Sequence, residues 1–414
     1  MSTSPATLAP YAERIAFITE LAERLHAYGT TAQRLEGALL GVADRLDIEC
    51  EPWVNPTGMI LSFRDPADSL AADFTRVIRL PPGDTDLSRL SRADRIAEAV
   101  LAGEMGVSEG RDALERIDLP RTRRWRVMQV AAFALVAGAV GCLLRLPWLD
   151  IATASVAGLG IGLLDQLSQG RQRLREPLEA LAGMLAAAIA VLVASLIGPI
   201  NLNTVIIAAV IVLLPGMALT NAVNELTSQH LVAGTARFAG AITTILKLTI
   251  GTMLTLTLAR LIGLEPAVHY ARPQPDWVEW LGLLVGGYAF AVAFRASRRD
   301  YPLVMIAATM GYLISRIGGE LWGDVAGVFL GAFGMTVAGN LYARVKNRPG
   351  ALIRLPGIIL LVPGSVSFRG LISLMQQQDL SAGQAAFMAV VNILMALIAG
   401  LMFGNLLLPP RRNL

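Results

Sequence analysis

The sequence predicts an all-α polytopic membrane protein, in which ten transmembrane helices form a 5+5 inverted repeat behind an N-terminal soluble α+β cytoplasmic domain. Three observations predict this class: an apolar composition, a charged N-terminal part, and a Pro-Gly motif that occurs in two long apolar runs. Of 414 residues, 54% are hydrophobic and 16% are charged, with a mean hydropathy of +0.55. A chain this apolar belongs mostly in a bilayer.

The charges divide the chain into a polar head and an apolar body. Residues 1–126 hold 16 Arg and 20 Asp and Glu, and the rest of the chain holds 19 Lys and Arg and 12 acids. The cations of the body lie between apolar runs, where they orient a membrane protein, so the basic balance does not indicate nucleic-acid binding. We expect a cytoplasmic domain over 1–124 and two five-helix membrane repeats over 125–264 and 275–410.

The head reads as helices followed by strands and further helices. A stripe of apolar residues at helical spacing ends at Gly29, and Thr30 with Gln33 suggests a capping box for a second helix. The runs "IECEPWV", "TGMILSF" and "FTRVIRL" are typical of short strands, and helices are expected near 86–102 and 108–117. No unbroken apolar stretch resembles a secretory signal, so we expect a cytoplasmic N-terminus.

From Trp125 onward, ten apolar runs approach the roughly 20 residues that a bilayer-spanning helix needs. Their connections place 17 cations on one side of the membrane and five on the other. The positive-inside rule then puts both termini in the cytoplasm. The expected spans are 126–146, 149–166, 178–198, 203–227, 237–263, 277–295, 301–317, 322–343, 351–374 and 383–408.

Two spans share a Pro-Gly pair in mid-run, "IIAAVIVLLPGMALTNAVNEL" and "RLPGIILLVPGSVSFRGLISL". Pro215 and Pro363 are 148 residues apart, and the same shift places the first five spans near the last five. This spacing predicts an internal duplication. Because five is an odd number, the second copy crosses the membrane in the opposite sense.

A Pro-Gly pair tends to unwind a helix, since Pro lacks an amide hydrogen and Gly tolerates non-helical angles. In a membrane such a break is tolerated where it lines a protein-enclosed cavity. Each break lies ~18 Å into its span at 1.5 Å per residue, so the two are expected to meet near the midplane. The helix beginning after each break would attract a carboxylate.

The alternative is that each pair merely kinks a packed helix. The candidate substrate-binding residues are Pro215, Gly216, Thr220, Asn221, Asn224, Pro363, Gly364, Ser365 and Ser367.

Three ionisable residues in or near apolar runs are candidates for proton coupling: Lys247, Glu225 and Asp165. Lys247 lies ~15 Å into its expected span, and a desolvated Lys can release its proton, whereas Arg cannot. It would neutralise a substrate carboxylate, pair with Glu225 or Asp165, or couple proton movement to export. The alternatives are a Lys at the cytoplasmic interface or a structural ion pair, and interface solvation for the two acids.

Motifs of enzymatic chemistry are absent from the sequence. It contains no Gly-x-Ser-x-Gly, His-Glu-x-x-His, Cys-x-x-Cys or Walker A pattern, and Cys50 and Cys142 lie in different regions. We therefore expect no catalytic residue, no cofactor and no metal. A membrane-anchored hydrolase and a channel remain as alternatives to a transporter.

The segments "YGTTAQRLEGALLGVADRLDIECEPWVNPTGMILSF", "LLPGMALTNAVNELTSQHLVAGTAR" and "LLVPGSVSFRGLISLM" resemble the bacterial threonine/serine exporter family. The resemblance covers essentially the whole chain. It implies a cytosolic domain with ten helices in the bacterial inner membrane, and export of threonine and serine driven by the proton motive force. Protons and the lipid bilayer are then partners, and the resemblance leaves open whether the protein forms a homo-oligomer. Relatives split over two chains resemble dicarboxylate (succinate) exporters, which leaves a dicarboxylate as the alternative substrate.

Overall fold

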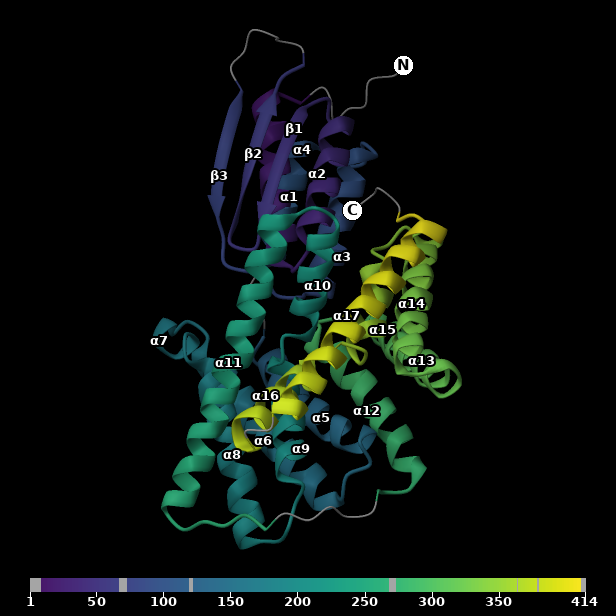
Figure 1. The fold of residues 1–414 in the computed structure, drawn as a ribbon. Coiled ribbons are helices and arrows are strands. Elements are labelled where there is room, and N and C mark those ends of the chain that lie inside the picture. Colours follow the sequence, from purple (N-terminus) through teal and green to yellow (C-terminus); the bar gives the residue numbers. More distant parts are fainter. Residues whose placement is uncertain are drawn as a thin grey trace.

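The structure, a computed structural model, describes residues 9–66, 73–118, 122–267, 273–362, 364–377 and 380–410. A head of helices and one small sheet lies at one end of a larger helical bundle (Figure 1). The head contains α1 (Tyr11–Ala27), α2 (Ala32–Arg45), β1 (Glu49–Asn55), β2 (Gly58–Arg64), β3 (Phe74–Arg79), α3 (Leu87–Leu101), α4 (Val107–Glu115) and the 3-10 turn η2 (Arg116–Asp118).

The sheet of the head is antiparallel in the order β1-β2-β3, with Trp53 opposite Ile60 and Ile60 opposite Val77. Alternate residues of β2, such as Leu61 and Phe63, are buried in the core that the head helices share with the sheet. The elements follow the predicted order. The predicted capping box at Thr30 is wrong: Thr31 is the N-cap of α2 and makes no side-chain cap hydrogen bond.

The bundle begins at α5 and continues almost to the end of the chain. Its elements are α5 (Arg123–Leu143), α6 (Trp148–Ser168), α7 (Gln172–Arg175), α8 (Leu178–Leu196), α9 (Leu202–Val210), η3 (Ile211–Leu213), α10 (Gly216–Thr227), α11 (Leu231–Leu261), α12 (Asp276–Ala293), η4 (Arg298–Asp300), α13 (Tyr301–Trp322), α14 (Asp324–Lys346), α15 (Ala351–Ile359), α16 (Gly364–Gln377) and α17 (Leu380–Leu407).

Within the described residues, eight helical segments are long and apolar enough to cross a membrane. The bent pair α9–η3 and α10 makes nine if it counts as one span. Helix α12 is not among them, since its 18 residues include Asp276 and Glu279 in the first turn. The ten expected spans therefore all fall on helices, but length and composition support eight or nine of them.

Small residues let the helices of the bundle approach closely. A side chain at Gly183 in α8 would overlap the carbonyl oxygen of Leu248 in α11, and one at Gly311 in α13 would overlap that of Gly357 in α15. Close approach through Gly and Ala is typical of helix pairs in membranes, where packing replaces the hydrophobic effect. Large apolar side chains such as Val156 and Leu258 remain exposed on the outside of these helices, as contact with lipid requires.

Candidate substrate site at the two helix breaks

The chain leaves helical geometry at both Pro-Gly pairs. Helix α9 ends at Val210, a 3-10 turn follows, and α10 starts at Gly216 in a direction that differs by 58°. In the second half, α15 ends at Ile359 and α16 starts at Gly364. Pro363 lies outside the described residues. Two interrupted helices are thus present at the positions that the repeated motif predicts.

The two breaks lie directly against each other. A Cβ built on Gly364 would lie 3.1 Å from the backbone nitrogen and 3.2 Å from the Cα of Gly216. A Cβ on Gly216 would lie 2.6 Å from Cγ2 of Val362. Helix α16 also packs against α9, α10 and α11, and its Phe368 is fully buried among residues of the first half. The chain needs Gly at both positions because the two main chains touch.

Polar groups follow the first break at helical spacing. The hydroxyl of Thr220 donates to the carbonyl oxygen of Gly216 (3.1 Å) and is buried. Asn221 is half-buried, and no described residue hydrogen-bonds its side-chain amide. Among the described residues, the backbone amides of Met217 and Ala218 also find no backbone acceptor, as is usual in the first turn of a helix. These donors suit a carboxylate.

The other candidate residues around the breaks differ in availability. Asn224 is half-buried, and its backbone carbonyl accepts a hydrogen bond from the Thr227 hydroxyl (2.9 Å). Ser365 and Ser367 are half-buried in the first turn of α16. Both breaks therefore have small polar side chains on the helix that follows.

Lys247 lies away from the breaks. Its Nζ donates to the backbone oxygen of Glu176 (2.8 Å) and pairs with Oε2 of Glu179 in the first turn of α8 (3.3 Å), and its side chain is 39% exposed. A pairing with Glu225 or Asp165, one of the three roles open for Lys247, is contradicted by these contacts. Helix α11 begins at Leu231, before the expected limit of 237, and the register of the helix places Lys247 level with the start of α8. This arrangement is the structural ion pair that the sequence left open.

Glu225 is fully buried, contrary to the expectation of a solvated boundary residue. Its Oε2 accepts from Nε of Arg237 (2.9 Å), and its Oε1 accepts from Nη2 of the same side chain (3.0 Å) and from the backbone amide of Ala32 (3.0 Å). The carboxylate therefore ties the start of α2 in the head to α10 and α11. Asp165, half-buried near the end of α6, accepts from Nε2 of Gln169 (3.3 Å) instead.

The head is anchored to both halves of the bundle (Figure 1). The first turn of α3 donates from the amides of Leu87 and Ser88 to the carbonyl oxygens of Phe294 (3.0 Å) and Arg295 (3.2 Å) at the end of α12. Unpaired amides at a helix start and unpaired carbonyls at a helix end satisfy each other there. In the first half, Nε2 of His230 contacts Oε2 of Glu36 in α2 (2.9 Å) beside the Glu225 contact.

Two family models match the chain: "Putative threonine/serine exporter" matches residues 16–259 and "Threonine/Serine exporter, ThrE" matches 279–407. The chain belongs to the threonine/serine exporter family. It is a multi-pass membrane protein.

The relatives of this chain are distant in sequence. It is similar to a "Probable threonine/serine exporter" of Mycobacterium tuberculosis, at 22% identity over 88% of this chain and 70% of the relative. It is also similar to "Pheromone-regulated membrane protein 10" of Yarrowia lipolytica (25% identity, 88% of this chain) and of Candida albicans (26%, 87%). The chain spans only 31% and 33% of the length of those two fungal proteins. No solved structure matches the chain.

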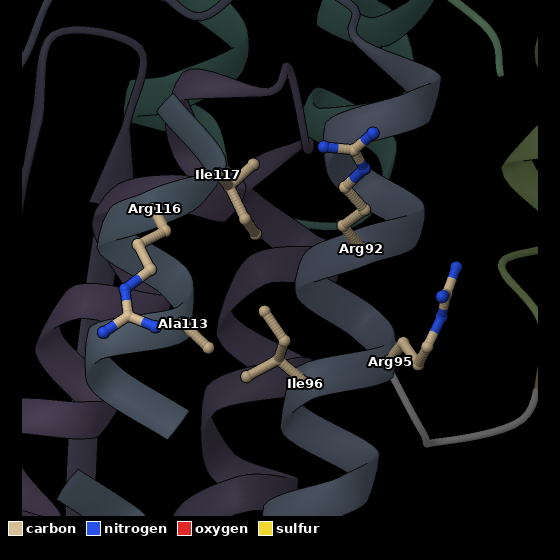
Figure 2. Close-up of a pocket in the computed structure, with 6 residues that line it drawn as sticks. All are labelled: Arg92, Arg95, Ile96, Ala113, Arg116 and Ile117. Atoms are coloured by element: carbon tan, nitrogen blue, oxygen red, sulfur yellow. The ribbon is translucent and has the colours of Figure 1, made fainter. Parts of the chain in front are cut away.

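The head carries a groove between α3 and α4–η2, with a volume of about 370 Å³ (Figure 2). The described residues that line it supply guanidinium and aliphatic groups, without a hydroxyl, thiol, imidazole or carboxylate. A nucleophile or a general base is therefore missing from this groove. The described part of the chain also brings together no group of three His, Cys, Asp or Glu residues that would hold a metal. The groove residues are Arg92, Arg95, Ile96, Ala113, Arg116 and Ile117.

Two buried carboxylates of the bundle were not among the predicted site residues. Asp150 in the first turn of α6 is fully buried, and Glu279 in the first turn of α12 is 5% exposed. Glu279 accepts from the hydroxyl of Tyr312 (2.8 Å) and pairs with Arg316. Their position at helix starts made them look like ordinary boundary acids. An available signal for Asp150 is that apolar residues flank it on both sides in "LPWLDIATA", whereas Glu279 has an apolar run only on its C-terminal side.

Proposed function

We propose that this protein is a secondary active transporter that exports small amino acids, threonine and serine foremost, from the bacterial cytoplasm by proton antiport. The observation that carries the proposal is the contact between the main chains at Gly216 and Gly364, which brings two interrupted helices together inside the bundle. Interrupted helices from two halves are the arrangement in which secondary transporters bind substrate and ions. The family membership supports export of this substrate class.

The site would hold the amino acid between the helices that start at the two breaks. The amides of Met217 and Ala218 would bind its carboxylate, and Asn221 and Ser365 would bind its polar groups. A dicarboxylate of the succinate type is the alternative substrate, because the helix starts favour any carboxylate. Permanent channel behaviour is the less favoured mechanism, since an inverted pair of halves suits alternating access.

The 5+5 arrangement is part of the proposal and makes α5–α11 and α12–α17 related halves. Packed pairs support it: α8 with α11 corresponds to α14 with α17, and α6 with α9 corresponds to α13 with α15. Residues 125–264 and 275–410 would be the two repeats. Both termini and the domain over 1–124 would lie in the cytoplasm. The anchors of α2 on one half and α3 on the other suit a head that regulates or assembles the transporter.

Efflux from preloaded cells tests the function. We expect cells that produce the protein to lose threonine and serine faster than control cells, and a protonophore to abolish the difference. Faster loss of succinate alone would show that the substrate is a dicarboxylate and not an amino acid. Equal loss of all three compounds with and without the protein would contradict the proposal.

Reporter fusions test the topology separately. Fusions at Asn201 and Pro273 should report the outside, and fusions at Arg173 and Arg298 the inside. A reversed result at either pair would remove the inverted repeat.

A further inference from the structure

The carboxylate of Asp150 is buried with one oxygen satisfied and the other without a partner. Its Oδ2 accepts from the backbone amide of Asn201 (3.1 Å) and from Nδ2 of the same residue (2.8 Å). Its Oδ1 is buried, and no described residue hydrogen-bonds it. A buried carboxylate oxygen that lacks a donor is costly while the group is charged, whereas a proton on that oxygen removes the charge.

No cation among the described residues lies against the carboxylate of Asp150. The helices packed against α6 near this residue are α5, α8 and α9, and α9 and the nearby ends of α5 and α8 carry no charged residue. The other described charged groups around this end of the bundle have partners of their own or face solvent. They include Arg145 with Asp276 (2.6 Å), Glu279 with Tyr312 and Arg316, and the exposed Arg260 and Glu265.

The second half offers an instructive comparison. In the proposed repeat, α6 corresponds to α13 and α9 to α15. Asp300, just before α13, is also buried, but Arg348, just before α15, binds both of its oxygens (2.7 and 2.8 Å). In the second half, the bridge between the second and fourth helices is the ion pair of Asp300 and Arg348. In the first half, the partner of Asp150 is the neutral side chain of Asn201.

We propose that Asp150 is a proton-binding residue of the transport cycle and that Asn201 positions it. This inference rests on the proposed antiport. Two influences on Asp150 oppose each other. The helix start and the two hydrogen bonds from Asn201 favour the charged carboxylate, while burial away from every described cation favours the neutral acid. Such a balance suits a group that must take up and release a proton in every cycle.

The proton would bind to Oδ1, the oxygen that is free to form an O–H bond. Asp150 lies at the end of α6 that the charge asymmetry places toward the outside, so the proton would come from external water when that side opens. It would leave to the cytoplasm after the transporter has changed its access, while the amino acid moves in the opposite direction. One proton is carried, and no other bond changes.

The test uses the full-length protein in proteoliposomes and the variant Asp150→Asn. An Asn at this position still accepts from Asn201 and resembles the protonated acid. We expect accumulation of threonine driven by a pH gradient to fall at least ~10-fold, while threonine–threonine exchange stays within a factor of ~3 and loses its pH dependence. A variant that responds to the gradient like the wild type would overturn the proposal. Asp300→Asn is the matched control: it should lower thermal stability and leave the pH dependence of exchange unchanged.

A second variant guards against poor folding of the first. Asn201→Ala removes one hydrogen bond to the charged carboxylate and should move the midpoint of the pH profile of exchange to higher pH by about one unit. An unchanged midpoint would refute the positioning role, because a purely structural contact alters amount or rate without moving the midpoint.

Infrared titration separates this inference from the proposed function. The wild type should show a band of a protonated carboxyl group that disappears in Asp150→Asn, even if the protein carries no threonine. Absence of exchange in the wild type would then reject the amino-acid proposal alone. Identical carboxyl bands in wild type and variant would reject the role of Asp150.

Discussion

Gly216 and Gly364 touch through their main chains, although 147 residues separate them in the sequence. Each is the first residue of the helix that follows a break, α10 in one half and α16 in the other. The contact leaves no room for a side chain between them. The relative position of the two helix starts is therefore set by backbone atoms.

Replacing Gly216 with Val should abolish transport. Its Cβ would lie 2.6 Å from Cγ2 of Val362 and 3.3 Å from the backbone nitrogen of Gly364, so the two breaks must separate. Initial rates of efflux at equal amounts of membrane-inserted protein measure the effect. Gly240→Val is the control, since a Cβ at Gly240 meets nothing within 4 Å. Equal rates for both variants would show that the contact is not needed for transport.

Substituting Asn221 or Ser365 with Ala should weaken substrate binding. Loss of one hydrogen bond to a buried ligand group costs ~1–3 kcal/mol, which corresponds to a roughly 5- to 150-fold higher apparent KM. Concentration dependence of uptake into inside-out vesicles measures this KM for threonine. Thr227→Ala, an exposed position further along α10, should leave it unchanged. If both Ala variants keep the wild-type KM, the substrate binds elsewhere.

Glu225→Gln should detach the head from the first half. The substitution removes the charge that binds Arg237 and weakens the acceptor of the Ala32 amide. Breaking a buried ion pair costs ~3–5 kcal/mol of stability. Hydrogen exchange in α2 measures the opening, and we expect faster exchange of the amides of its first turn. Glu179→Gln, which breaks a more exposed pair, serves as comparison. Unchanged protection in Glu225→Gln would contradict the anchoring role.

Lys247 should be dispensable for proton coupling. Because its Nζ pairs with Glu179 and is partly exposed, we expect Lys247→Arg to transport normally and Lys247→Met to lose only stability. Transport rates at several pH values measure this. A loss of transport in both variants would instead show that a titratable group is required at this position.

Acid should destabilise the head through His26. Its Nε2 donates to the carbonyl oxygen of Asn55 (3.1 Å), and its buried Nδ1 has no hydrogen-bond partner among the described residues. Burial lowers the pKa of His26 below 6.5. The unfolded chain then binds more protons than the folded head, so stability falls as pH drops below about 6.5 and continues to fall until the lowered pKa is reached. Thermal unfolding followed by the fluorescence of Trp53 measures this change, and His26→Gln should flatten it. An equally steep loss in His26→Gln would assign the effect to another group.

Local patterns predicted much of the fold and of the site. Strand-like runs and helical stripes gave the order of the head elements, and Pro-Gly in an apolar run located both breaks. These features depend on residues close together in the sequence. The contact of Gly216 with Gly364 was also within reach, because the spacing of the two motifs indicates a symmetric pair.

Such local patterns do not predict contacts between residues on elements that are far apart in the sequence. Glu225 seemed solvated near a span boundary, yet the head covers that boundary and buries the residue. Lys247 was predicted to lie deep in the membrane, because the sequence did not indicate that α11 begins at Leu231, before the apolar run. Asp150 looked like an ordinary first-turn acid, and its lack of a cation depends on which helix ends surround it.

One residue of the bundle belongs to the core of the head: Ala233, in the first turns of α11, is buried among the apolar side chains of that domain. A ribosome makes the head long before it makes α11. Part of the core of the head therefore stays exposed until the first half of the bundle has been inserted and α11 packs against the head. Completion of the core of the head is thus a late step of biogenesis, which follows the insertion of the first membrane helices.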